Sequence, residues 1–228
     1  AFATYIRKLD PYSHPIVVHT FPGQYDKVYR PLLGFADFNG PSLQTTDTHA
    51  QTVQWVTEST KAGRRWLVFL DEIAQADIGV KPDADDPAHD EVRQRHIWGN
   101  LMGGGAGVEW YFGYKFPNND LNCEDFRSRQ EMWRQTKIAL DFFHKYLPFW
   151  EMTSADARVE TGQYCFAKEG AVYAIYLPKG GEAKLDLGNI AGEFRVRWFN
   201  PRQGGELADG SVKTVRGHAD LHAGRHLP

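Results

Sequence analysis

The sequence predicts an α/β region over residues 1–150, followed by a small all-β domain over residues 151–228. Helical and strand patterns alternate as far as residue 147, which is the order that parallel strands with crossover helices require. After residue 155, short alternating strands are separated by turns rich in glycine and proline, as in an antiparallel β-sandwich. Pro148 lies between the two patterns and marks the predicted boundary.

The first region reads as four short apolar strands, each with a helical pattern before or after it. Residues 1–9 form a helical pattern that Asp10-Pro11 stops. Predicted strands cover residues 16–19, 42–46, 66–70 and 108–112. Predicted helices cover residues 48–63, 91–102 and 124–146.

Four strands in under 150 residues are too few for a complete (β/α)8 barrel, which needs about 250 residues and at least about 200. The pattern therefore fits either a small open sheet or half of a barrel. In the second region, predicted strands cover residues 163–168, 172–177, 183–187 and 194–199.

Composition excludes several classes of protein. Aromatic residues make up 14% of the chain, so it can bury a core and is not intrinsically disordered. With 26 basic and 29 acidic residues, there is no positive excess to neutralise a phosphate backbone, which argues against nucleic-acid binding. No run reaches the roughly 18 apolar residues needed to cross a bilayer, so no membrane span is expected.

Two cysteines, Cys123 and Cys165, are too few for a disulfide framework and lack the spacing of a zinc site. Two unlinked thiols are favoured over a bridge. The chain opens inside a helical pattern with no cap before it, which leads us to expect a fragment of a longer protein.

Glu72 is the sharpest candidate for chemistry. It follows the apolar strand at residues 66–70, which stops abruptly at Asp71-Glu72. In a barrel, catalytic groups sit at the carboxyl ends of the strands, and a carboxylate there suits nucleophilic attack on the anomeric carbon of a sugar. Strands also end in polar residues simply because they meet water, and position alone supports both interpretations equally.

A second group of candidates follows the fourth predicted strand, as Glu109-Trp110-Tyr111. Aromatic rings at the mouth of a site stack on sugars, although most aromatics fill cores. A carboxylate in an apolar strand needs a partner, so Glu109 either lines the cleft or pairs with Arg93 or Arg95.

His19 and Gln44 occupy comparable strand-end positions and could bind a substrate hydroxyl, although a single such residue is more often structural. The acidic segment at residues 83–90 offers carboxylates that calcium prefers, but its spacing lacks the EF-hand glycine and terminal Glu. A solvated loop that supplies helix caps is the better interpretation, and no metal or cofactor is expected.

Taken together, these motifs resemble the second half of a bacterial (β/α)8 retaining glycoside hydrolase of the apiosidase-like and cellulase-like kind. The resemblance is carried by His14-Pro15-Ile16-Val17-Val18-His19, Ser42-Leu43-Gln44, Asp71-Glu72 and the segment 95–113. Residues 172–202 resemble the β domain that follows such barrels, often labelled a "putative collagen-binding domain".

The resemblance implies strands five to eight of a TIM barrel followed by an antiparallel β-sandwich. Glu72 then matches the nucleophile at the end of strand seven, and the acid/base Glu would lie upstream of residue 1. His19, Gln44, Glu109, Trp110 and Tyr111 would bind the carbohydrate substrate. The missing half of the barrel becomes an expected partner, self-association through open barrel edges an alternative, and a secreted or periplasmic location the expected compartment.

Two other functions remain open at this stage. The first is a non-catalytic module that binds carbohydrate or matrix through its β domain. The second is an independent small α/β domain with another function, which analogy of fold does not exclude.

Overall fold

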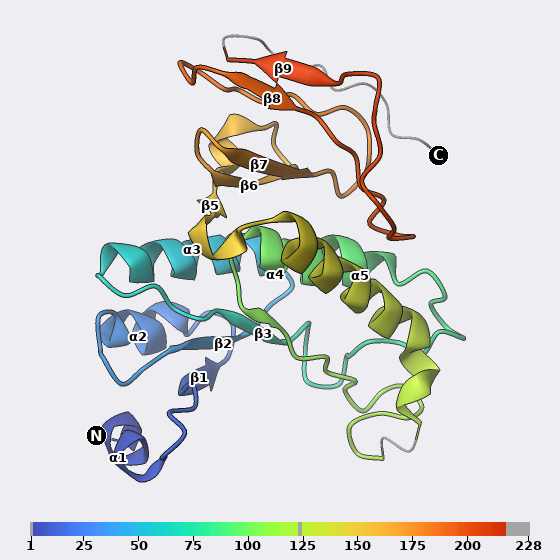
Figure 1. Cartoon of the computed structure of the whole chain (residues 1–228). Helices are drawn as coiled ribbons and strands as arrows, with labels where there is room; N and C mark the ends of the chain where they lie inside the picture. Colours follow the sequence, from blue (N-terminus) through green and yellow to red (C-terminus); the bar gives the residue numbers. More distant parts are fainter. Residues whose placement is uncertain (1, 123–124, 218–228) are drawn as a thin grey trace.

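The computed structural model describes residues 2–122 and 125–217, and Figure 1 shows how its elements are arranged. The first region is built on four parallel strands in the order β1-β2-β3-β4. The strands are β1 Val17–Thr20, β2 Gly40–Gln44, β3 Phe69–Glu72 and β4 Gly107–Val108. The helices are α1 Phe2–Leu9, α2 Tyr25–Tyr29, α3 Thr48–Lys61, α4 Trp98–Met102 and α5 Gln130–Tyr146, and a π-helical segment, Val92–Ile97, leads into α4.

One face of this sheet is covered by helices and the other is partly open. Leu43, Val68 and Leu70 are fully buried, in a core shared with Trp55 of α3. Because successive strand residues point to opposite faces, Leu67 belongs to the other side of the sheet, where its exposed fraction is 40%. Figure 1 shows α3, α4 and α5 together on one side of the sheet.

The expectation of half a TIM barrel followed by a β-sandwich is wrong. The parallel strands form a small open sheet, and two separate antiparallel sheets follow it. The predicted strand at residues 108–112 is mostly diverted: β4 ends at Val108, and Tyr111 instead accepts a hydrogen bond from the backbone of Val80. Gly79 permits this approach, since a Cβ there would lie 2.1 Å from the carbonyl carbon of Phe112.

The second region contains a three-stranded sheet and a two-stranded sheet, both antiparallel. The first joins β5 Thr153–Ser154, β6 Tyr164–Lys168 and β7 Val172–Tyr176; the second pairs β8 Glu193–Arg195 with β9 Thr214–Arg216. In the predicted strand at residues 183–187, only Ala183 makes a β-bridge and the other four residues form no ladder, although Leu185 and Leu187 are buried. Gly180, Gly181 and Gly188, all with positive φ, flank this segment, and such backbone interrupts a ladder.

An apolar cluster joins the two regions. Trp98 of α4 stacks on Tyr176 of β7, with ring centroids 4.9 Å apart, and Phe143 of α5 packs against Phe166 of β6. Leu147 and Phe149, beside the predicted boundary, also pack in this cluster, whereas Trp150 is 67% exposed. This cluster contains residues from both sides of residue 150, so the structure shows no break in packing there. The domain boundary at residue 150 therefore stays a prediction.

A histidine of α3 adds a polar connection between the regions. His49 Nδ1 lies 2.9 Å from the carbonyl oxygen of Gly99, and its Nε2 lies 2.8 Å from Oδ2 of Asp156. Its ring stacks on Tyr164 at 3.6 Å. Both ring nitrogens face acceptors, so the imidazolium form makes both bonds at once.

We predict that His49→Ala lowers the free energy of unfolding by about 1–3 kcal/mol, because it removes a buried imidazole that bonds both the half-buried carboxylate of Asp156 and the carbonyl oxygen of Gly99. Urea denaturation measures this loss. His14→Ala, at a histidine whose side chain is 72% exposed, is the control and should change little. Equal stability of His49→Ala and the wild type would contradict a connecting role.

The same contact predicts a loss of stability in acid. Burial opposes the charged form of Asp156, but hydrogen bonds from His49, Cys165 and Ser154 outweigh it and hold its pKa below the ordinary range. A lowered pKa in the folded state stabilises the protein at neutral pH, and this contribution disappears as pH falls through that pKa. Thermal melts from pH 6 down to pH 3 should show a smaller acid-induced loss in Asp156→Asn than in the wild type.

Candidate functional site

The carboxyl ends of β1, β2 and β3 bring polar side chains together at one edge of the parallel sheet. Ser42 of β2 lies opposite His19 of β1 on one side and opposite Phe69 of β3 on the other. Side chains two residues apart in a strand share a face, so Ser42 and Gln44 point to the same side as His19. Ligands of open α/β sheets bind outside this edge of the strands.

A register shift between β2 and β3 places two consecutive carboxylates on this face. Leu43 pairs with Leu70, but the next pair is Gln44 with Glu72, so Asp71 is an extra residue in β3. A bulge of this kind re-aims side chains that would otherwise alternate. Asp71 Oδ2 accepts a hydrogen bond of 2.7 Å from Ser42 Oγ, and Glu72 Oε2 accepts one of 2.8 Å from Gln44 Nε2.

His19 connects the two carboxylates. Its Nδ1 lies 2.9 Å from Oδ2 of Asp71, and its Nε2 lies 3.6 Å from Oε1 of Glu72. The exposed side-chain fractions are 35% for His19, 26% for Asp71 and 20% for Glu72. The three groups are therefore held by the protein yet reachable from solvent, as a reacting site requires.

Gln44 is fixed more firmly than a surface amide. Its Nε2 also donates to the backbone oxygen of Ala74 at 2.9 Å. Its own backbone oxygen accepts a hydrogen bond from the hydroxyl of Tyr25, which stacks on Tyr29. Within the described part of the chain, Gln44 Oε1 is buried and has no hydrogen-bond partner.

Glu109 and Asp120 complete a group of four carboxylates, Asp71, Glu72, Glu109 and Asp120, which we call the carboxylate cluster. Glu109 follows β4 and faces Asp71, whereas Arg93 and Arg95 pair with Asp90 and Glu91, so the expected arginine partners are not used. Asp120 lies in the loop after β4 and accepts a hydrogen bond of 2.8 Å from the backbone of Phe112.

Burial and like charge together raise two pKa values in the cluster. For Glu109, burial, the charge of Asp71, a hydrogen bond to Asp71 and the charge of Asp120 all raise the pKa. For Glu72, burial, Asp71 and Asp120 raise the pKa, and the positive charge of a protonated His19 opposes them. Two carboxyl groups linked by a hydrogen bond share one proton, so Glu109 is the member of the cluster suited to carry it.

The two aromatic candidates point to different surroundings. Tyr111 lies close enough to Glu72 and Asp120 for their charges, after burial, to raise the pKa of its phenol, and its hydroxyl donates to the backbone oxygen of Ala76. Trp110 instead donates from Nε1 to Thr136 Oγ1 of α5 at 2.9 Å. Of the expected stacking residues, only Tyr111 lies beside the carboxylates.

The structure brings together His19, Gln44, Glu72, Glu109 and Tyr111 from the sequence-predicted set and leaves Trp110 apart. Sequence reasoning missed Ser42, Asp71 and Asp120 as members. Ser42 could have been predicted from the sequence, because it lies two residues before Gln44 and shares its face of the strand. Asp120 could not, because it lies in a loop where no strand or helix pattern fixes the direction of its side chain.

The acidic segment at residues 83–90 supports helices and does not join the cluster. Asp83 accepts from the backbone of Glu131 in the first turn of α5 at 3.0 Å, and its other oxygen lies 2.7 Å from His89 Nε2. No group of three or more His, Cys, Asp or Glu among the residues described is arranged to hold a metal ion. Cys165 is a free, buried thiol, while Cys123 lies outside the described residues.

The comparisons with known proteins bear on the second region. Residues 152–225 match the family described as "Putative collagen-binding domain of a collagenase", which agrees with the resemblance of the β domain. The glycoside hydrolase resemblance of the first region gains no support from them. Searches of curated proteins and of solved structures found no match. No helix in residues 2–122 or 125–217 is long and apolar enough to cross a membrane.

We predict that Glu109→Gln raises the melting temperature at pH 7. An acid whose pKa is raised by folding destabilises the protein above that pKa, because the ionised form meets Asp71 and Asp120. Glutamine resembles the protonated form and removes the repulsion, so wild type and variant should converge at pH 4. Calorimetry at both values tests this, with Glu91→Gln as the matched surface control. A melting temperature lowered at pH 7 would contradict the prediction.

Proposed function

We propose that the carboxylate cluster hydrolyses a glycosidic bond of an oligo- or polysaccharide with retention of configuration, and that Glu72 is the nucleophile. The observation that carries the proposal is that Asp71 lies beside two carboxyl groups, the held and partly exposed Glu72 and the proton-carrying candidate Glu109. Retaining glycosidases use these two groups, one as nucleophile and one as acid and then base.

The nucleophilic role fits Glu72 because neighbouring side chains fix the position of both of its oxygens. Gln44 donates to Oε2, and His19 Nε2 lies 3.6 Å from Oε1, where a protonated imidazole opposes the rise in the Glu72 pKa that burial causes. In the proposed first step, the carboxylate attacks the anomeric carbon and the bond to the leaving oxygen breaks. The product is a glycosyl ester on Glu72 and a released alcohol.

The proton for the leaving oxygen comes from Glu109 in this proposal. Its raised pKa keeps a proton available at higher pH than an ordinary Glu does. In the second step, Glu109 takes a proton from water, the water oxygen attacks the anomeric carbon, and Glu72 is freed.

Glycosides with a dinitrophenyl leaving group test the nucleophile without depending on the acid, because dinitrophenolate leaves unprotonated. We expect a panel of these glycosides to include one that the protein cleaves, with at least about a hundredfold loss in Glu72→Gln. Its 2-fluoro analogue should add one glycosyl mass to a peptide that contains Glu72. Glu91→Gln, at a side chain that is 66% exposed and outside the carboxylate cluster, is the control.

Glu109→Gln tests whether Glu109 is the source of the proton. If Glu109 is the acid, this variant loses activity on natural glycosides but retains cleavage of the dinitrophenyl substrate. If Glu109→Gln keeps its activity on both substrates, a group other than Glu109 is the acid. Cleavage that survives Glu72→Gln, or labelling of another residue, would overturn the nucleophile assignment.

A second candidate function is binding to matrix or carbohydrate through the second region. The match over residues 152–225 favours it, because the family is described by collagen binding. Cosedimentation with fibrillar collagen and with insoluble polysaccharides tests it, and Glu72→Gln should bind as the wild type does. Either function acts on material outside the cell, so a secreted or periplasmic location remains our proposal.

A further inference from the structure

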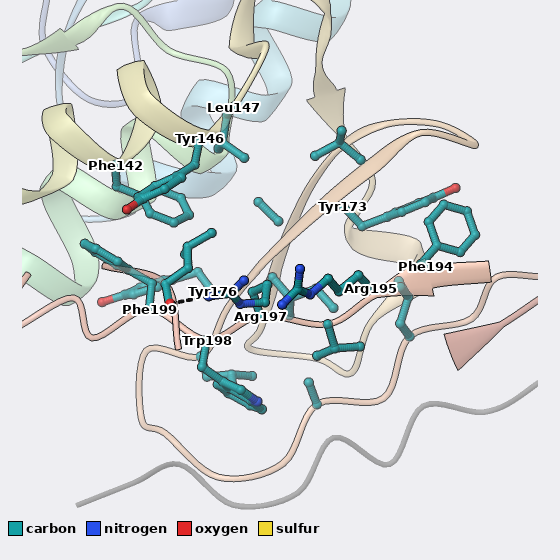
Figure 2. A pocket seen from close by; sticks show the side chains of 18 of the residues that line it. Phe142, Tyr146, Leu147, Tyr173, Tyr176, Phe194, Arg195, Arg197, Trp198 and Phe199 are labelled. Atoms are coloured by element: carbon teal, nitrogen blue, oxygen red, sulfur yellow. Dashed lines mark hydrogen bonds between the residues drawn. The ribbon is translucent and has the colours of Figure 1, made fainter. Parts of the chain in front are cut away.

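A cavity of about 500 Å³ lies between α4, α5 and the two antiparallel sheets, away from the carboxylate cluster. Volumes of roughly 300–1,000 Å³ are typical of small-molecule sites. Its lining is mostly apolar and aromatic. Figure 2 shows Phe142, Tyr146 and Phe199 at one end and Tyr173 with Phe194 at the other.

Two arginines lie between these aromatic ends, as Figure 2 shows. Arg195 Nη2 lies 3.4 Å from Oδ1 of Asp209, and Arg197 Nε lies 3.3 Å from the same oxygen. A single carboxylate therefore faces two guanidinium groups, which leaves one positive charge in excess beside an apolar cavity. Glu193, which also lines the cavity, is paired with Arg216 and does not cancel that charge.

The cavity therefore combines apolar and aromatic walls with the excess positive charge at Arg195 and Arg197. Apolar walls suit the body of an organic molecule, and the guanidinium groups suit an acidic group. Together these two features specify an amphipathic anion.

We propose that this cavity binds a small amphipathic organic anion, an aromatic or medium-chain acid, with its apolar body among the aromatic side chains and its charged group at Arg195 and Arg197. Asp209 competes with the ligand for the two guanidinium groups. Removing that carboxylate should therefore strengthen binding, whereas removing the arginines should weaken it. This opposite behaviour distinguishes a ligand site from a merely structural ion pair.

The test uses the full chain and two fluorescent probes of similar shape, anionic 8-anilinonaphthalene-1-sulfonate and neutral N-phenyl-1-naphthylamine. We expect saturable binding of the anionic probe at one site per chain, competed by decanoate. Arg195→Gln/Arg197→Gln should weaken the anionic probe by about tenfold and leave the neutral probe nearly unchanged. Asp209→Asn should tighten the anionic probe severalfold.

Arg127→Gln is the matched control, since this arginine lies outside the cavity lining and its side chain is 72% exposed. Circular dichroism melts check that each variant is folded. If the double arginine variant does not fold, the change in affinity of Asp209→Asn still tests the proposal. Absence of saturable binding would overturn the proposal. So would equal binding of the anionic probe by the wild type, the double arginine variant and Asp209→Asn.

Discussion

One extra residue in β3 determines the chemistry of the sheet edge. Because Asp71 has no partner across β2, the strand brings Asp71 and Glu72 to the same face, and both can meet His19. A regular strand would alternate them, with one carboxylate among the buried residues that pack against the helices. The hydrogen bonds from Ser42 and Gln44 match this shifted register and hold it in place.

The groups around the bulge reduce the repulsion among the four carboxylates of the carboxylate cluster. Four neighbouring carboxylates repel one another, but Glu109 and Asp71 can share a proton, and His19 can supply a positive charge. Below the edge, Leu43 and Leu70 are fully buried, so the rigid core fixes the strands on which the polar groups stand. Functional groups placed on packed strands hold their geometry better than groups on loops.

The sequence predicted part of the candidate site, but it did not predict the features that depend on how the strands pair. The abrupt stop of an apolar run predicted that Glu72 ends a strand. Nothing local predicted the register shift, which depends on the pairing of β3 with β2. The predicted half barrel and sandwich were wrong because Tyr111 and Gly113 pair with Val80 and Ile78, away from β3, and because residues 183–187 form no ladder. After β4 the chain leaves the sheet, and Trp110 donates to Thr136 of α5 instead of lying beside the carboxylates.

The central claim is that Asp71, Glu72 and Glu109 act as one coupled group, and a carboxyl titration tests it most directly. Carbon-13 NMR of protein labelled at the glutamate side-chain carboxyl carbon would follow Glu72 and Glu109 separately. The account predicts that both titrate above the ordinary range for Glu, and that Asp71→Asn lowers both midpoints. Midpoints in the ordinary range that Asp71→Asn leaves unchanged would contradict it.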